Sequence, residues 1–264
     1  MPLIFIKLGG SLITDKRQRA TARPRLLKRL ARELQAAREA LPDLQILLGH
    51  GSGSFGHWEA SRYQTRAGVE TAAQWQGFAE VSAAALRLNR LVVDAFINAG
   101  VPVLSLQPAA SVLAEGGRIV TLAHKPIQRA LDAELIPTIF GDVAFDRELG
   151  GTILSTEDLF VHLAPLLQPQ RILLLGNAPG VLDDQRQVIP CITPGSYPQF
   201  EPFLRGSGYV DVTGGMADKV ERMVTLVNQL PGLRIWILSG HEPDALSRAL
   251  LDPDGISGTC ITAD

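Results

Sequence analysis

The chain has 264 residues, of which 46% are hydrophobic and 20% charged, as is ordinary for a globular protein with a substantial core. Its formal net charge of −2 argues against a nucleic-acid-binding protein that relies on a basic surface. Two cysteines without metal-ligand spacing, and the lack of both a signal peptide and an apolar run of roughly 20 residues, predict a cytoplasmic protein without a membrane partner.

Strands and helices are predicted to alternate, because short apolar runs are separated by amphipathic segments with helical spacing. The first half is predicted to contain a strand over residues 3–8, a helix over 24–41, a strand over 44–48, a helix within 69–98, a strand over 101–106, a hairpin over 111–122, a helix over 124–135 and a strand over 136–140. The second half is predicted to contain a helix from 155 to about 169, a strand over 171–175, a long loop near a site over 183–209, a helix over 214–230, a strand over 234–238, a helix over 243–250 and a strand over 258–262.

This alternation predicts an α/β fold in which a mainly parallel central sheet lies between two layers of helices, an open three-layer αβα sandwich. No internal repeat, low-complexity segment or linker divides the chain. We therefore expect one domain over residues 1–264 that has two lobes.

Glycines directly follow the first two predicted strands. The sequence Lys7-Leu8-Gly9-Gly10-Ser11 ends the first strand, and Gly49-His50-Gly51-Ser52-Gly53-Ser54-Phe55-Gly56-His57 ends the second. Glycine leaves backbone N–H groups open to a ligand, and successive N–H groups before a helix bind anions. Two such loops side by side indicate a site for more than one phosphate, and hence a phosphotransferase.

Three lysines and one histidine accompany these loops. Lys7 ends the first strand, where open α/β sheets bind ligands, and Lys16 is close enough in sequence to fold back over the same phosphates. Lys219 lies about one turn inside a helix opened by a third glycine pair. His57 offers a hydrogen bond, or a positive charge, to a phosphate of the acceptor. The alternative interpretations are solvated lysines and a packing histidine.

Two common nucleotide motifs are disfavoured. No Gly-x-x-x-x-Gly-Lys-Ser/Thr sequence of a standard P-loop occurs. The segment from Gly51 to Gly56 matches Gly-x-Gly-x-x-Gly, but it follows the second strand and, apart from Glu70, lacks an acidic residue at the expected spacing. A Rossmann dehydrogenase is therefore not expected.

Together these segments resemble the amino acid kinase superfamily. The Lys-x-Gly-Gly-Ser sequence is shared across that superfamily, whereas Ser-Phe-Gly-His over residues 54–57 resembles the isopentenyl phosphate kinases and the related fosfomycin-resistance kinases. The matching segments are Lys7-Leu8-Gly9-Gly10-Ser11 through Lys16, residues 50–57, Gly141-Asp142-Val143, and Asp211-Val212-Thr213-Gly214-Gly215-Met216 with Lys219.

The resemblance implies an acceptor-binding lobe over about residues 1–165, a nucleotide-binding lobe over about 166–264, and a homodimer. It implies that the γ-phosphate of ATP is transferred, with Mg²⁺, to isopentenyl phosphate, which yields isopentenyl diphosphate and ADP. The attacking phosphate oxygen is already anionic near neutral pH, so no general base is required. The expected partners are these small molecules and a second copy of the chain.

The resemblance also implies roles for individual residues. The three lysines neutralise the transferring phosphoryl group, with Lys16 as the main transition-state stabiliser, and His57 with the Gly51 backbone holds the acceptor phosphate. The residues expected at ATP are Lys7, Leu8, Gly9, Gly10, Ser11, Ser52, Asn177, Gly215 and Lys219. The residues expected at the acceptor are Gly51, Ser54, His57, Thr156 and Glu157, and none is expected to ligate a metal directly. Trp75, Phe78 and Val81 are candidates for an apolar pocket, or equally for plain core.

Three departures from the family pattern bear on the site. Ser52 replaces a glycine that is common in the family, and Gly176-Asn177-Ala178-Pro179-Gly180-Val181 replaces the usual Thr-Asn/Asp-Val-Asp-Gly-Val. The family's Ser-Gly-Asp is Ser155-Thr156-Glu157 here, which leaves either Glu157 or Asp158 to orient the lysines.

Several functions remain open from the sequence. The nearest alternative is a kinase for another small phosphate or phosphonate, such as fosfomycin. A superfamily kinase for a carboxylate, carbamate or UMP is disfavoured by His57, because carboxylate acceptors typically require arginine. A non-catalytic nucleotide or anion sensor is disfavoured because Lys7, Lys16 and Lys219 are all present.

Overall fold

The structure is a computed structural model that describes residues 2–206 and 215–264. An eight-stranded sheet forms its centre, with the strand order β10-β12-β11-β9-β1-β2-β6-β3. These strands are β1 (Leu3–Leu8), β2 (Gln45–His50), β3 (Val103–Ser105), β6 (Ile136–Phe140), β9 (Arg171–Gly176), β10 (Cys191–Ile192), β11 (Arg234–Ser239) and β12 (Thr259–Ile261). Every neighbouring pair from β11 to β3 is parallel, while β12 runs antiparallel to β11.

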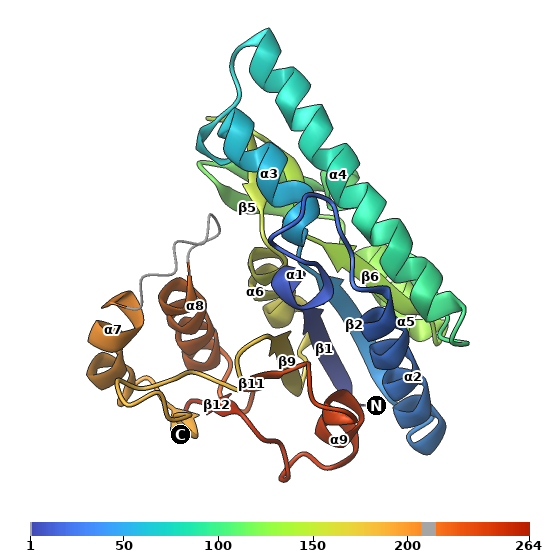
Figure 1. Ribbon diagram of the computed structural model, residues 1–264, viewed down its shortest axis with the longest axis vertical. Coiled ribbons are helices and arrows are strands. Elements are labelled where there is room, and N and C mark those ends of the chain that lie inside the picture. Colours follow the sequence, from blue (N-terminus) through green and yellow to red (C-terminus); the bar gives the residue numbers. More distant parts are fainter. Residues whose placement is uncertain (1, 207–214) are drawn as a thin grey trace.

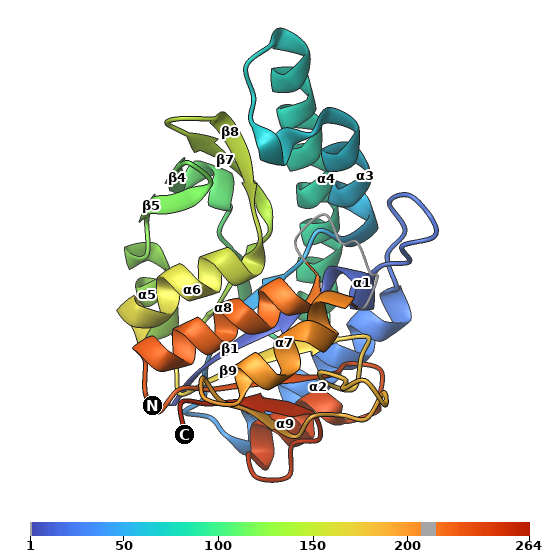
Figure 2. The ribbon, with the colours of Figure 1, turned by 90° about the vertical axis from the view of Figure 1, so that its left-hand side faces the viewer.

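Helices cover both faces of this sheet (Figures 1 and 2). One face packs against α2 (Pro24–Ala40), α4 (Ala72–Ile97) and α9 (Ala245–Leu251). The other packs against α5 (Lys125–Asp132), α6 (Thr156–Leu167) and α8 (Met216–Gln229). The predicted αβα sandwich with a mainly parallel sheet is therefore confirmed. None of the helices in the described ranges has the length and apolar character that a bilayer crossing requires.

The alternation of side chains along β1 places a lysine beside α6 and α8. Ile4, Ile6 and Leu8 point into the core with α2, α4 and α9, whereas Phe5 points into the core with α6 and α8. Because successive side chains of a strand point to opposite faces, Lys7 lies on the same face as Phe5. A strand with no exposed side chain thus carries a lysine towards two helix N-termini.

A smaller, four-stranded sheet has the strand order β5-β4-β7-β8. Its strands are β4 (Val112–Glu115), β5 (Arg118–Leu122), β7 (Asp142–Asp146) and β8 (Gly150–Leu154). The predicted hairpin is confirmed, and it turns at Gly116 and Gly117 with φ values of 56° and 78°. The antiparallel pair β7–β8 was not predicted, because its aspartates and glycines obscure the strand pattern in the sequence.

Two further differences concern helices. The predicted loop over residues 183–209 is wrong in part, because it contains β10 and helix α7 (Tyr197–Gly206). Pro198 lies in the first turn of α7, where a missing N–H costs nothing, so this proline is compatible with a helix. Helix α3 (Gly53–Tyr63) was not predicted as an element, because Gly53 and Gly56 weaken its local propensity.

We expect Phe5→Ala to lower the free energy of unfolding by about 3–5 kcal/mol, because it opens a cavity between β1 and α6. Phe5 has no exposed surface, and its ring centroid lies 5.0 Å from that of Phe160. Urea denaturation measures the change. Leu166→Ala is the control, because Leu166 of α6 is 49% exposed. Equal unfolding midpoints for Phe5→Ala and the wild type would contradict this packing.

Candidate active site

The predicted phosphate loops meet at one edge of the central sheet, because β1, β2, β6, β9 and β11 are parallel and end together. A row of backbone hydrogen bonds continues past the strand ends. The N–H groups of Gly9, Gly51, Gly141 and Gly240 donate to the carbonyl oxygens of Leu175, Leu8, His50 and Gly176, at 2.8, 3.0, 3.1 and 2.9 Å. These hydrogen bonds therefore hold the loops next to one another where the strands end.

The first and second glycine loops touch each other through their backbones. A Cβ atom on Gly10 would lie 2.4 Å from the nitrogen of Gly53, and one on Gly51 would lie 2.9 Å from the nitrogen of Gly10. Gly53 has a φ of +50°, whereas Ser52 has an ordinary φ of −76°. The serine at position 52 is therefore tolerated, because the left-handed conformation falls on the glycine after it.

Thr14 links the two loops by side-chain hydrogen bonds. Its buried hydroxyl donates to the Gly10 carbonyl at 2.6 Å and accepts the Ser54 N–H at 3.0 Å. The Ser54 hydroxyl in turn accepts the Thr21 N–H at 3.2 Å, and Ser54 is 1% exposed. Both polar groups of Ser54 are thus engaged within the protein, so the structure does not support its predicted contact with the acceptor.

Thr156 is also engaged within the protein. Its hydroxyl donates to the His50 carbonyl at 2.6 Å, and the residue is 1% exposed. Gly49 permits this approach, since a Cβ there would lie 2.5 Å from the Thr156 methyl carbon. The Thr156 side chain therefore joins α6 to β2 and does not face an acceptor. The predicted ATP contact of Leu8 is limited to its backbone for a similar reason, because its side chain is fully buried.

A buried carboxylate lies between two of the predicted catalytic lysines. Glu157, at the N-terminus of α6, forms an ion pair with Lys7, and the two residues are 7% and 8% exposed. Lys219 of α8 places its Nζ atom 3.8 Å from Oε1 of Glu157. Burial acts to raise the pKa of Glu157, but the charges of Lys7 and Lys219 lower it to about 2. Glu157 is therefore ionised at neutral pH and draws both ammonium groups to one point.

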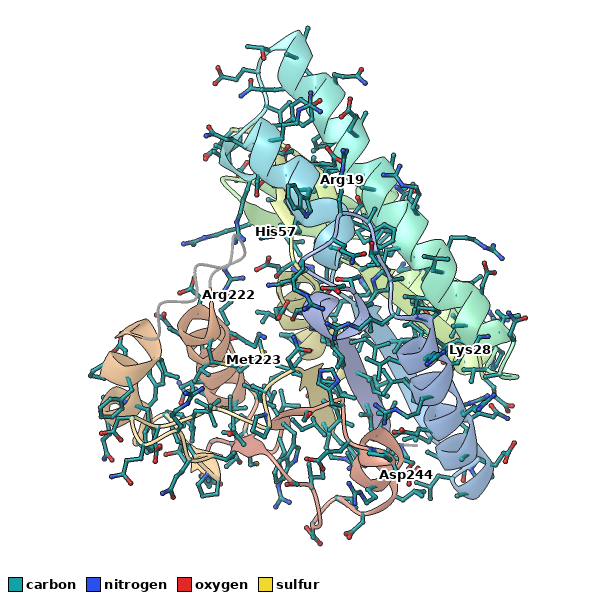
Figure 3. All side chains as sticks on the ribbon, in the orientation of Figure 1. Arg19, Lys28, His57, Arg222, Met223 and Asp244 are labelled. Atoms are coloured by element: carbon teal, nitrogen blue, oxygen red, sulfur yellow. The ribbon has the colours of Figure 1, made fainter. Side chains whose placement is uncertain are left out.

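Asp158, the other candidate for this role, has different partners. Its carboxylate accepts the Ser155 N–H at 2.8 Å, and its own N–H donates to the Ser155 hydroxyl at 3.1 Å, which completes a capping box. Asp158 also forms an ion pair with Arg222 of α8. Figure 3 shows Arg222 on α8 below His57. Glu157 therefore contacts the lysines, while Asp158 caps α6 and ties it to α8.

Lys16 lies in an exposed segment, residues 15–22, that packs on α3. The Ala20 N–H donates to the Ser54 carbonyl at 3.2 Å, and Arg19 forms an ion pair with Glu59, which is 4% exposed on α3. The segment that carries Lys16 is thus attached to the helix that carries His57.

His57 is half-buried on α3 and lines a cavity of about 30 Å³. The cavity wall is apolar at Ala60, Val81, Ala85 and Ile153, and charged at Arg66 and Asp142. Burial raises the pKa of the Asp142 carboxyl, which accepts hydrogen bonds from Val143 and Gln107.

The three residues predicted to line an apolar pocket fall into two groups. Val81 lines the His57 cavity. Trp75 and Phe78 instead form an aromatic cluster with Phe145, with ring centroids 5.3–6.0 Å apart. Phe78 nonetheless belongs to the same apolar cluster as Val81. The aromatic residues therefore pack in the cluster that contains Val81, but they do not line the His57 cavity.

Arg66 at the His57 cavity was missed by the sequence reasoning. It lies in a short turn, η1 (Thr65–Ala67), after α3, and its carbonyl accepts the Thr152 hydroxyl of β8 at 3.3 Å. No glycine motif or helical spacing marks this arginine in the sequence. Only the packing of η1 against the second sheet brings it to the cavity.

The structure describes some of the residues that were predicted to bind ATP. Asn177 follows β9, and its side-chain amide donates to the Ser11 carbonyl at 3.2 Å. Gly215 is the N-cap residue of α8 and precedes Lys219 by about one turn. The residues Asp211-Val212-Thr213-Gly214 of the predicted third loop lie outside the described residues.

The carboxylate nearest to the predicted phosphates has two partners within the protein. Within residues 2–206 and 215–264, no group of three or more His, Cys, Asp or Glu residues could hold a metal ion. Glu157, the carboxylate nearest to the predicted phosphates, already pairs with Lys7 and Lys219. Glu157 therefore balances the charge of these two lysines.

Comparison with known proteins identifies the family. Residues 2–239 match the model of the amino acid kinase family. The chain belongs to this family. It is therefore a phosphotransferase.

The similar proteins are nearly full-length matches. The chain is 32% identical to an isopentenyl phosphate kinase of Methanothermobacter thermautotrophicus, over 98% of this chain and 99% of that protein. It is 35% identical to an isopentenyl phosphate kinase of Haloferax volcanii, over 86% and 89% of the two chains. An X-ray structure of isopentenyl phosphate kinase superposes with a TM-score of 0.82 at 28% identity, covering 98% of this chain and all of that one.

The Glu157 ion pairs predict a specific dependence of stability on pH. The folded pKa of about 2 lies below the ordinary value of 4.5, so this stabilisation is present above about pH 4.5 and is lost as the pH falls towards 2. Between pH 7 and pH 3, we expect the wild type to lose on the order of 2 kcal/mol more than Glu157→Gln. Urea denaturation at each pH measures this difference. Glu70→Gln, at an exposed site, should follow the wild type; parallel pH profiles for all three proteins would contradict the prediction.

Proposed function

We propose that the protein transfers the γ-phosphate of ATP to isopentenyl phosphate, which yields isopentenyl diphosphate and ADP. The observation that carries the proposal is the position of His57, at a cavity with a largely apolar wall beside the glycine loops. The similarity to isopentenyl phosphate kinases over almost the whole chain supports the same acceptor.

The reaction that follows requires positioning and charge neutralisation. An anionic oxygen of the acceptor phosphate attacks the γ-phosphorus of ATP, and the bond to the leaving ADP oxygen breaks. Lys7 and Lys219, already drawn together by Glu157, neutralise charge on the transferring group, and Lys16 approaches from the segment over α3. His57 holds the acceptor phosphate, whereas the Gly51 N–H, predicted for the same role, donates to the Leu8 carbonyl and keeps the second glycine loop beside the first. No general base is needed, because the attacking phosphate oxygen is already anionic near neutral pH.

We propose that Mg²⁺ enters this site with the ATP phosphates. Mg²⁺ typically keeps several waters and is bound by substrate phosphates together with only one or two carboxylates. The pairing of Glu157 with two lysines supports this arrangement, because that carboxylate balances protein charge instead of metal charge.

We also propose an acceptor lobe over about residues 1–165, a nucleotide lobe over about 166–264, and a homodimer in the cytoplasm. Strand β3 is an edge of the large sheet, and Leu104 on it is 42% exposed. Leu91 and Ile97 of the neighbouring helix α4 are 44% and 50% exposed. Exposed apolar residues on an edge strand and on the helix beside it support self-association.

A second acceptor class has one observation in its favour. The His57 cavity of about 30 Å³ is small for a five-carbon chain, and Arg66 and Asp142 add charge to its wall. Both features favour a compact, polar phosphonate such as fosfomycin over an apolar five-carbon chain.

Release of ADP from Mg·ATP with the purified protein tests the acceptor assignment. We expect turnover with isopentenyl phosphate at a micromolar KM, and we would compare dimethylallyl phosphate and fosfomycin in the same assay. Turnover with fosfomycin alone would replace the acceptor while keeping the site chemistry. Binding of ATP without turnover of any of the three would contradict the proposed reaction.

We expect His57→Ala to raise the KM for the acceptor roughly ten- to hundredfold, or to abolish turnover, because a charge-assisted hydrogen bond to phosphate is lost. ATP binding should remain close to that of the wild type. Trp58→Ala is the matched control, since Trp58 follows His57 on α3 and is 50% exposed. An unchanged KM and kcat in His57→Ala would remove His57 from the site.

A further inference from the structure

The loop that follows β11 carries a histidine that reaches the nucleotide side of the site. Nε2 of His241 lies 2.8 Å from Oδ1 of Asn177, and the Asn177 amide nitrogen donates to the Ser11 carbonyl at 3.2 Å. Ser11 belongs to the first glycine loop, within helix α1 (Gly10–Ile13). A series of hydrogen bonds from His241 through Asn177 to Ser11 thus joins the segments that follow β11, β9 and β1.

The chemistry of these groups determines their orientation. The Ser11 carbonyl can only accept a hydrogen bond, so it must face the NH₂ group of Asn177. The amide oxygen then faces His241 and can itself only accept, so Nε2 of the histidine carries the donated proton. His241 is therefore a donor whether its ring is neutral or charged.

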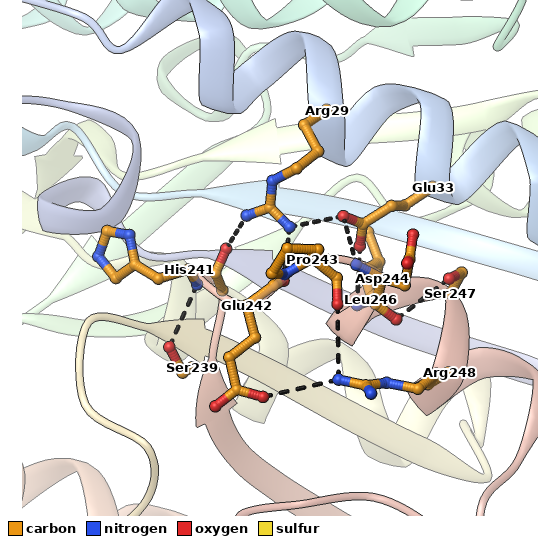
Figure 4. A network of polar contacts seen from close by, with 11 residues as sticks. Arg29, Glu33, Ser239, His241, Glu242, Pro243, Asp244, Leu246, Ser247 and Arg248 are labelled. Atoms are coloured by element: carbon orange, nitrogen blue, oxygen red, sulfur yellow. Dashed lines mark hydrogen bonds and ion pairs between the residues drawn. The ribbon is translucent and has the colours of Figure 1, made fainter.

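The loop that presents His241 is held firmly from the opposite side (Figure 4). Arg29 of α2 donates to the carbonyl oxygens of Gly240 and Glu242, and Glu33, which is 5% exposed, accepts the Asp244 and Leu246 N–H groups at 3.1 and 3.0 Å. The His241 N–H donates to the Ser239 hydroxyl at 3.1 Å. In Figure 4 the imidazole points away from Arg29, so the anchored loop holds the ring out towards Asn177.

We propose that His241 is a positioning residue for nucleotide binding, which fixes the Asn177 amide against Ser11 and so presets the first glycine loop for the phosphates of ATP. The proposal rests on the proposed function, because it takes this loop as part of the ATP site. Without His241, Asn177 loses the partner of its amide oxygen, and its rotamer is no longer determined from both ends. Loss of His241 therefore weakens the binding of ATP and leaves the binding of the acceptor unchanged.

The test is a comparison of ATP affinity, measured by calorimetry without acceptor, with the KM values for ATP and acceptor and with thermal stability. We expect His241→Ala to weaken ATP binding roughly five- to tenfold, the loss of one hydrogen bond, with the acceptor KM unchanged. His241→Gln, which keeps an N–H donor, should restore most of the affinity. Arg248→Gln is the control, because Arg248 pairs with Glu242 of the same loop at 3.6 Å and lies away from the His241 imidazole in Figure 4.

A double-mutant cycle shows whether His241 acts through Asn177. In an Asn177→Ala background, His241→Ala should cause no further loss of ATP affinity. Additive losses, equal effects on both KM values, or an unchanged ATP affinity in folded His241→Ala would overturn the proposal. A wild type that binds ATP but does not turn over isopentenyl phosphate would instead overturn the acceptor assignment, and the affinity comparison would still decide the role of His241.

Discussion

The ion pairs of Glu157 constrain the whole candidate site, because a buried carboxylate without partners would be strongly destabilising. Glu157 stabilises Lys7, which a strand with no exposed residues carries into the interior, and it attracts Lys219 from α8. Three elements from distant parts of the chain, β1, α6 and α8, are thereby fixed relative to one another. The protein itself therefore brings Lys7 and Lys219 together, without the help of a ligand.

Much of the fold could be predicted from the sequence where local and tertiary preferences agree. The strands Leu3–Leu8 and Ile136–Phe140 have the predicted bounds, because apolar runs end at glycine or at a change of pattern. Helix α3 and the β7–β8 pair could not be predicted in the same way. Their glycines and aspartates are locally unfavourable, and the contacts that compensate, such as Thr14 with Ser54, come from elsewhere in the chain.

For the site, the motifs predicted which segments meet but not which way each side chain points. The glycine loops do meet at the sheet edge, yet the side chains of Ser54 and Thr156 turn into the framework. Glu157 and Asp158 are adjacent in sequence but lie about 100° apart around α6, so only the packed helix determines which one faces Lys7. Arg66 reaches its cavity through tertiary packing alone, which no local pattern encodes.

The backbone hydrogen bonds of the glycines at the strand ends also fix the distance between the first and second glycine loops. Adjacent strands lie about 4.7–4.9 Å apart, and the first and second glycine loops leave the neighbouring strands β1 and β2. The close backbone contacts of Gly10 with Gly53 and of Gly51 with Gly10 keep the two loops at this separation. Because backbone atoms set the distance, substitutions of exposed side chains at the site change the charge and shape that a ligand meets without moving the loops apart.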